Sequence, residues 1–178
     1  LYESHPVETR DGYELQLYRS RPGLACRAGI LPPVLLLPGA NSNRLTFGVT
    51  RGQTLPDALN AVGRDVWMLD FRGCRSSRYL GCGEPTINLD VKMREDLPAA
   101  VANILSMTGH TQVDLIGHSL GGVFTYAFCA RDHAGVVRRA TTIASPAHFS
   151  RFFGKAAGVM HLPTKWLAPA AKHIRAIA

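Results

Sequence analysis

Residues 113–122 read VDLIGHSLGG. The aliphatic residues 113–116 are typical of a short strand buried on both faces, and residues 120–131 have the composition of a helix packed directly behind it. Residues 117–121 fit the pattern GxSxG, and another glycine follows. In this context the pattern predicts a sharp strand-to-helix turn that holds a serine in a strained conformation at its tip. The residues of the predicted turn are Gly117, His118, Ser119, Gly121 and Gly122.

The hydroxyl of Ser119 is therefore a candidate nucleophile. The start of a helix carries partial positive charge that favours a developing oxyanion, and we expect the Leu120 amide to donate one hydrogen bond to it. A second donor is expected from the loop after the first buried strand, where Ala40 is favoured over Asn41. Two plainer interpretations stay open: Ser119 as a serine of the core, and residues 38–39 as an ordinary glycine turn.

Other segments place this turn in an α/β fold. Aliphatic strands are predicted at residues 33–37, 66–70 and 136–144, and helices at 54–62 and 88–107, the latter bent or restarted at Pro98. Asp11-Gly12, inside an alternating segment, predicts a hairpin turn with two positive φ angles. The repeating strand–helix order predicts a mostly parallel, doubly wound sheet with an antiparallel N-terminal hairpin.

These segments resemble the α/β-hydrolase family, and within it the acid-lipase and esterase branch. The resemblance spans about residues 5–150 and implies a serine hydrolase that cleaves carboxylic esters, with lipid-like substrates favoured, through an acyl-enzyme on Ser119. Two departures are Pro38, where the family usually has histidine, and Arg75, where glycine is commoner. The segments that carry it are DGYELQLYR (11–19), VLLLPGAN (34–41), DVWMLDFRGCRSS (65–77), DLIGHSLGG (114–122) and IASPAHF (143–149).

The family places its acid and its histidine after the nucleophile. The only acid after Ser119 is Asp132, which is expected at a helix end facing away from the site. Among the later histidines His148 falls nearest the expected active-site edge, where contact with a lid is favoured over a catalytic role. None can be assigned as the general base; the four are His133, His148, His161 and His173.

The missing acid and base predict that the chain is the N-terminal portion of a longer hydrolase. Residues 1–150 would form its core through the sixth family strand, and residues 151–178 the start of a lid. Residues 166–178 would form an amphipathic helix with a basic outer face, as a lid over an acyl pocket, a solvated packing helix or a membrane-surface contact. The strand at 136–144 would be an unpaired apolar edge, so self-association is expected.

Two other functions stay open. An acyltransferase or thioesterase would use the same serine, and a catalytically silent homologue would act as a binding or structural unit. The formal net charge of +7 arises after residue 119, where eight Lys and Arg face one acid; without aromatic platforms or a binding motif it does not indicate a nucleic-acid partner. The expected partner is a small acyl ester.

Several classes of site and location are constrained by the sequence. No apolar run is long enough for a membrane span, and neither a metal nor a cofactor is expected because the cysteines lack CxxC spacing. Cys74 and Cys82 flank a glycine-rich loop and could pair, although free thiols are the commoner state of isolated cysteines. The first residues lack the features of a secretory signal, so a cytoplasmic location is slightly favoured.

Overall fold

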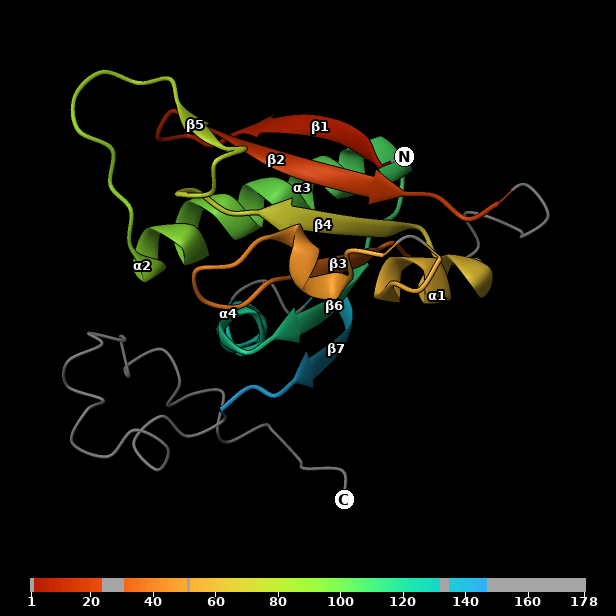
Figure 1. Cartoon of the computed structure of the whole chain (residues 1–178). Coiled ribbons are helices and arrows are strands. Elements are labelled where there is room, and N and C mark those ends of the chain that lie inside the picture. The colour runs from red at the N-terminus through yellow and green to blue at the C-terminus, as the bar shows by residue number, and fades with distance from the viewer. Residues whose placement is uncertain (1, 24–30, 51, 132–134, 147–178) are drawn as a thin grey trace.

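A computed structural model describes residues 2–23, 31–50, 52–131 and 135–146 of the chain. They form a seven-stranded sheet in the order β1-β2-β4-β3-β6-β7, with β5 paired to β2 (Figure 1). The strands are β1 (Glu3–Glu8), β2 (Tyr13–Ser20), β3 (Val34–Leu37), β4 (Val66–Asp70), β5 (Arg78–Tyr79), β6 (Val113–His118) and β7 (Val137–Ile143). The helices are η1 (Arg44–Phe47), α1 (Leu55–Ala61), α2 (Leu89–Val91), η2 (Lys92–Asp96), α3 (Leu97–Thr108) and α4 (Leu120–Cys129).

The sheet is mixed, as the sequence predicts. Strands β4, β3, β6 and β7 are parallel neighbours, whereas β1, β2 and β4 pair antiparallel. Every residue of β3 and β4 is buried, which explains why both read as continuous apolar runs rather than alternating ones. The doubly wound α/β sheet with an N-terminal antiparallel hairpin is therefore confirmed.

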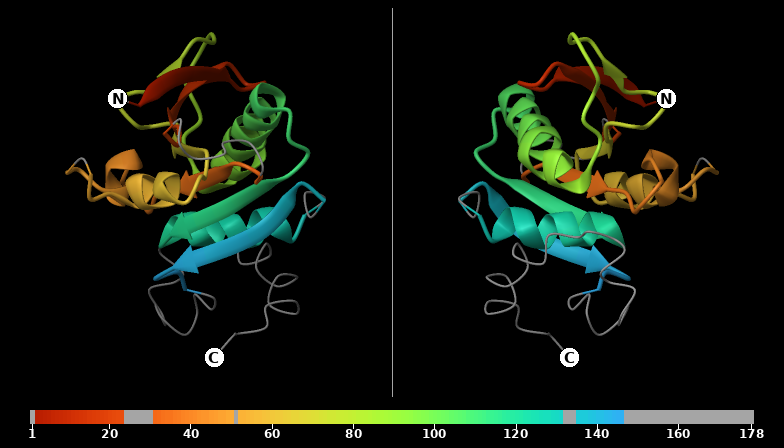
Figure 2. Two further views of the ribbon diagram at one scale, coloured as in Figure 1. Left: turned by 90° about the vertical axis from the view of Figure 1, so that its right-hand side faces the viewer. Right: turned by 90° about the vertical axis from the view of Figure 1, so that its left-hand side faces the viewer.

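Two hydrophobic clusters lie on opposite faces of the sheet, and Figure 2 shows helices on both sides. Alternate residues of β3 and β4 divide between them, because successive side chains of a strand point to opposite faces. Leu35, Leu37, Trp67 and Leu69 join residues of α3 and α4. The smaller cluster, under α1 and η1, comprises Val34, Leu36, Phe47, Val66 and Met68.

The two predicted helices are present, and local hydrogen bonding explains where each begins. At α1 the Thr54 side chain accepts from the Asp57 amide while the Asp57 carboxylate accepts from the Thr54 amide, which satisfies the first free amides of the helix. The second helix is interrupted by the π-helical segment η2, and α-helical bonding resumes at Leu97, directly before Pro98. Proline has no N–H to donate along the helix, so the restart at Pro98 follows from its chemistry.

The hairpin is present where it was predicted, but the predicted conformation of its turn is wrong. Residues 9–12 connect β1 to β2, and only Gly12 has a positive φ, of 83°. The Gly12 amide donates to the Thr9 carbonyl at 3.1 Å, and the Thr9 amide donates to the Tyr13 carbonyl at 2.8 Å. Asp11 therefore does not adopt the predicted left-handed conformation, and its side chain accepts from Thr9 and Arg72.

The strand β7 pairs with β6 alone among the described elements, so the predicted edge is present there. Its predicted apolar character is wrong, because between Val137 and Ile143 the strand carries two arginines and two threonines. Arg138 donates to Asp114 of β6 and thereby ties the edge strand to the sheet. Self-association through this edge stays a prediction.

Several predictions fall outside the described residues: the lid at 151–178, Asp132, and the four late histidines. Cys74, Cys82 and Cys129 are free thiols, so the disulfide alternative is not the state seen here. No helix in the described part of the chain is long and apolar enough to cross a membrane.

Candidate active site

The predicted turn between β6 and α4 is present, with Ser119 at its tip. Ser119 has φ 51° and ψ −117°, a region that residues with a Cβ adopt at a cost of about 1–3 kcal/mol. Its amide donates to the Ile143 carbonyl at 2.9 Å, and its carbonyl accepts from the Gly122 amide at 3.0 Å. The backbone on both sides thus holds the strained conformation.

The glycines around Ser119 are required by close packing of backbone. A Cβ on Gly117 would overlap the Gly121 carbonyl, and a Cβ on Gly121 would overlap the carbonyl oxygen of Leu37. A Cβ on Gly122 would overlap the Ser145 hydroxyl. The three positions let α4 start directly against the ends of β3 and β6, as the GxSxG pattern predicts.

The loop after β3 lies against the tip of the turn. A Cβ on Gly39 would be 3.2 Å from the Ser119 Cβ, so this loop passes immediately beside the serine. Ala40 and Asn41 follow it, both exposed, and Asn41 has a positive φ of 50°. The structure therefore brings Ala40, Asn41 and Leu120 to the serine, whereas their role as hydrogen-bond donors to an oxyanion stays a prediction.

His118 lies beneath the same loop. Its Nδ1 atom is buried and forms no hydrogen bond within the described residues, and a Cβ on Gly39 would be 3.3 Å from it. The imidazole of His118 thus packs against the loop after β3.

An open cavity of about 1100 Å³ lies beside Ser119, at the carboxyl ends of β3, β4, β6 and β7. Ligands of α/β proteins bind at this edge, where the loops after parallel strands converge. The apolar part of its lining includes Phe71, Ile87, Leu89, Leu120 and Phe124. The loop after β3 contributes Gly39, Ala40, Asn41, Ser42 and Asn43.

Asp70, at the end of β4, joins two loops of the cavity wall. It is buried, and its carboxylate accepts from the Arg44 amide and guanidinium, both at 2.7 Å, and from the Ser76 hydroxyl at 2.7 Å. The Arg44 guanidinium also stacks 3.8 Å from the centre of the Tyr18 ring. Asp70 thus fixes the loop after β3 against the loop after β4.

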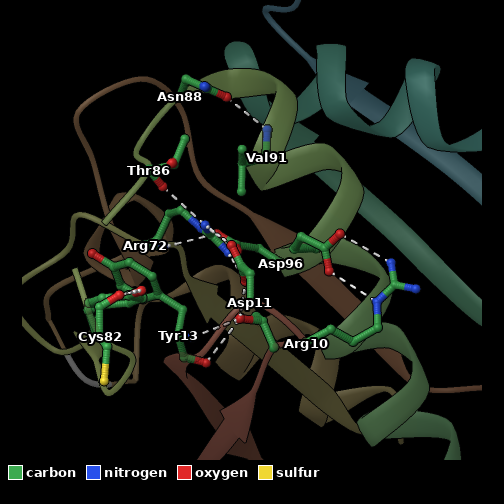
Figure 3. Close-up of polar contacts among 12 residues, drawn as sticks. Arg10, Asp11, Tyr13, Arg72, Cys82, Thr86, Asn88, Val91 and Asp96 are labelled. Carbon is green, nitrogen blue, oxygen red and sulfur yellow. Dashed lines mark hydrogen bonds and ion pairs between the residues drawn. The ribbon is translucent and has the colours of Figure 1, made fainter. Parts of the chain in front are cut away.

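A second cluster of buried ion pairs fixes the loop after β4 (Figure 3). Arg72 is fully buried and donates to Asp96 at 2.7 Å and to Asp11 at 2.6 Å. Its hydrogen bond lowers the pKa of Asp11 to about 2, whereas burial raises the pKa of Asp96 to about 6 against the opposing effect of Arg72. The cluster connects the β1–β2 turn, β4 and η2.

The sequence analysis did not identify these two clusters. Asp70 and Arg72 stand in the segment DVWMLDFRGCRSS, but their charged partners are 24 to 61 residues away in the chain. The available signal was Asp70 itself, which ends an otherwise apolar buried strand. Because a buried charge needs a partner, its position indicates an ion pair.

The acid and base of a catalytic triad are not found in the part of the chain that the structure describes. None of the described residues that line the cavity is a histidine or carries a carboxylate. Within the same described residues no group of His, Cys, Asp and Glu could hold a metal ion.

Comparisons with known proteins agree with this architecture. The sequence profile of the family described as the alpha/beta hydrolase fold matches residues 32–161. Triacylglycerol lipase 2 of Arabidopsis thaliana is 32% identical over 160 residues, which cover 83% of this chain and 38% of that protein. Human lysosomal acid lipase/cholesteryl ester hydrolase is 36% identical over 129 residues, which cover 67% of this chain and 32% of that protein.

The chain thus spans about a third of the length of the curated relatives it matches. Among solved structures, an esterase of Pyrococcus furiosus superposes with a TM-score of 0.66 over 97% of this chain and 61% of that chain, at 19% identity. At this identity the likeness concerns the fold alone.

Proposed function

The chain belongs to the α/β-hydrolase family, and we propose that it hydrolyses carboxylic esters of lipid-like acids through an acyl-enzyme on Ser119. The observation that carries the proposal is the strained conformation of Ser119, with φ 51°, at the start of α4 and at the wall of an open cavity. A serine held in this way presents its hydroxyl to a bound ester rather than to the core. The lipase names of the relatives support the choice of ester.

In the proposed reaction the Ser119 hydroxyl oxygen attacks the ester carbonyl carbon while its proton leaves to a general base. The carbonyl oxygen becomes an anion that accepts hydrogen bonds from the Leu120 amide and from Ala40 or Asn41. Collapse of this intermediate expels the alcohol and leaves an acyl group on Ser119, and water then attacks the acyl carbon to release the acid. The general base must come from residues beyond those the structure describes.

The first test is acyl transfer to the serine. In the full-length protein, which supplies the general base, we expect release of p-nitrophenol from p-nitrophenyl butyrate, with a loss of at least about 1000-fold in Ser119→Ala. A fluorophosphonate probe should label the wild type at Ser119. The matched control is Ser145→Ala, another half-buried serine of the same cavity, which should keep both the turnover and the label.

The result separates this function from a silent homologue. Equal slow turnover by the wild type and by Ser119→Ala, with no probe at Ser119, would mean that the turn is a vestige in a binding or structural protein. Labelling at Ser145 instead would place the nucleophile outside the turn.

A further inference from the structure

The cavity beside Ser119 carries positive charge that its lining does not offset. Arg75, in the loop after β4, and Lys92, at the start of η2, both line it. Arg72 lines it as well, but its charge is bound by Asp11 and Asp96. Among the described residues that line the cavity, none is an aspartate or glutamate. Arg75 and Lys92 together are called the cationic wall below.

Two acids in the neighbouring segments form their closest contacts with other residues. Asp70 binds Arg44 and Ser76, and Asp96 binds Arg72 through a fully buried pair. Neither Arg75 nor Lys92 lies within 4 Å of a carboxylate in the described residues, whereas most arginines there do. Residues 133–178 contain no Asp or Glu at all, so that part of the chain cannot neutralise the wall.

The cationic wall borders an apolar surface. Lys92 is half-buried, and its Nζ lies 5.9 Å from the centre of the Phe71 ring. Phe71 in turn packs against Phe124 of α4, with ring centres 5.1 Å apart, five residues along the chain from Ser119. Ile87 and Leu89 line the same side of the loop before Lys92. A ligand bound along this surface would contact apolar side chains and, at their edge, a positive charge.

We propose that Arg75 and Lys92 form an anion-binding subsite that selects acyl esters carrying a second, anionic group, a carboxylate or a phosphate, away from the scissile bond. The inference rests on the proposed hydrolysis at Ser119 and names its substrate class. The anionic group does not react: the ester bond is cleaved by water to an acid and an alcohol, and the charge only holds the substrate in place. A charge-assisted hydrogen bond to the half-buried ammonium of Lys92 is stronger than a neutral one, and the exposed guanidinium of Arg75 adds a second positive charge.

Two esters of equal chain length test this specificity. Mono-p-nitrophenyl adipate ends in a carboxylate, whereas p-nitrophenyl hexanoate ends in a methyl group. We expect the ratio of kcat/KM for adipate over hexanoate to fall about tenfold in Lys92→Gln and in Arg75→Gln, mainly through KM for adipate. Arg78→Gln is the control: this exposed arginine pairs with Glu14 outside the cavity and should leave the ratio unchanged. An unchanged ratio in both cavity variants overturns the proposal.

A binding measurement separates the subsite from the chemistry. In the Ser119→Ala background, calorimetry should show octanoate or octyl phosphate binding about tenfold more tightly than neutral octanamide, and the preferred anion identifies the substrate's charged group. The double variant Lys92→Gln/Arg75→Gln should lose this preference. If the preference survives in the double variant, or is absent from the start, the subsite is wrong. If Ser119→Ala shows the preference but the wild type shows no Ser119-dependent turnover, the subsite stands and the hydrolase proposal fails.

Discussion

The amide of Ser119 donates to the carbonyl oxygen of Ile143 at 2.9 Å, which ties the tip of the turn to the last residue of β7. The strained conformation of Ser119 is therefore held both by β6, which it follows, and by the neighbouring parallel strand β7. The edge strand is held in turn by Arg138, which donates to Asp114. The position of the candidate nucleophile therefore depends on β7 as well as on the GxSxG segment.

Gly121→Ala should disrupt the start of α4. The added methyl group would overlap the carbonyl oxygen of Leu37, an atom of a fully buried strand that cannot move aside. We expect a loss of about 1–3 kcal/mol in the free energy of unfolding, measured by urea denaturation, because overpacking forces backbone shifts. Gly135→Ala is the matched control, since a Cβ there meets nothing within 4 Å. Equal stability of the two variants would contradict the packing described for the turn.

Arg72→Met should be among the most destabilising single changes. It leaves the Asp96 carboxyl fully buried without its cation, and loss of one partner of a buried pair costs about 3–5 kcal/mol. The double variant Arg72→Met/Asp96→Leu should regain part of that loss, because the orphaned charge is then gone. Arg10→Met, which breaks the exposed pair with Glu95, should cost less than about 1 kcal/mol. Equal losses for Arg72→Met and Arg10→Met would show that burial does not govern these pairs.

The stability of the chain should fall between about pH 4 and pH 2 in a way that depends on Asp11. The hydrogen bond from Arg72 lowers the pKa of Asp11 to about 2, below the value of about 3.9 expected in the unfolded chain. In this window the unfolded state binds more protons, so the free energy of unfolding decreases as pH falls. The raised pKa of Asp96 matters in a different window, between about pH 4 and 6. There the folded state binds more protons, so this group makes the free energy of unfolding increase as pH falls.

The check is urea denaturation of the wild type and Asp11→Asn at intervals of half a pH unit. The variant should be less stable at pH 7 and should show a shallower loss below pH 4. Parallel curves for the two proteins would mean that the Asp11–Arg72 contact contributes nothing to acid unfolding.

Local chemistry explains which parts of the fold could be predicted. The start of the helix at Thr54, the restart at Pro98 and the turn at Ser119 each depend on neighbours within a few positions, so the sequence predicts them directly. The ion pair of Asp11 in the first turn was not predicted, because its partner Arg72 is 61 residues away. Asp70 was missed for the same reason: its role is to join two loops that only the folded sheet brings together.

Asp70→Asn should therefore lower activity, although Asp70 takes no part in the proposed reaction. The carboxylate accepts from Arg44 twice and from Ser76, and so fixes the loop that carries Ala40 and Asn41 against the loop that carries Cys74. An amide can keep only part of these bonds and has no charge for Arg44, so the loop after β3 should become more mobile. We expect kcat on p-nitrophenyl butyrate to fall about 10- to 100-fold, because small displacements of positioning groups are costly to rate.

Asp65→Asn, which breaks another buried pair with Arg19 at the opposite ends of the strands, is the control for stability alone. If the two variants lose stability and kcat in the same proportion, Asp70 has no positioning role.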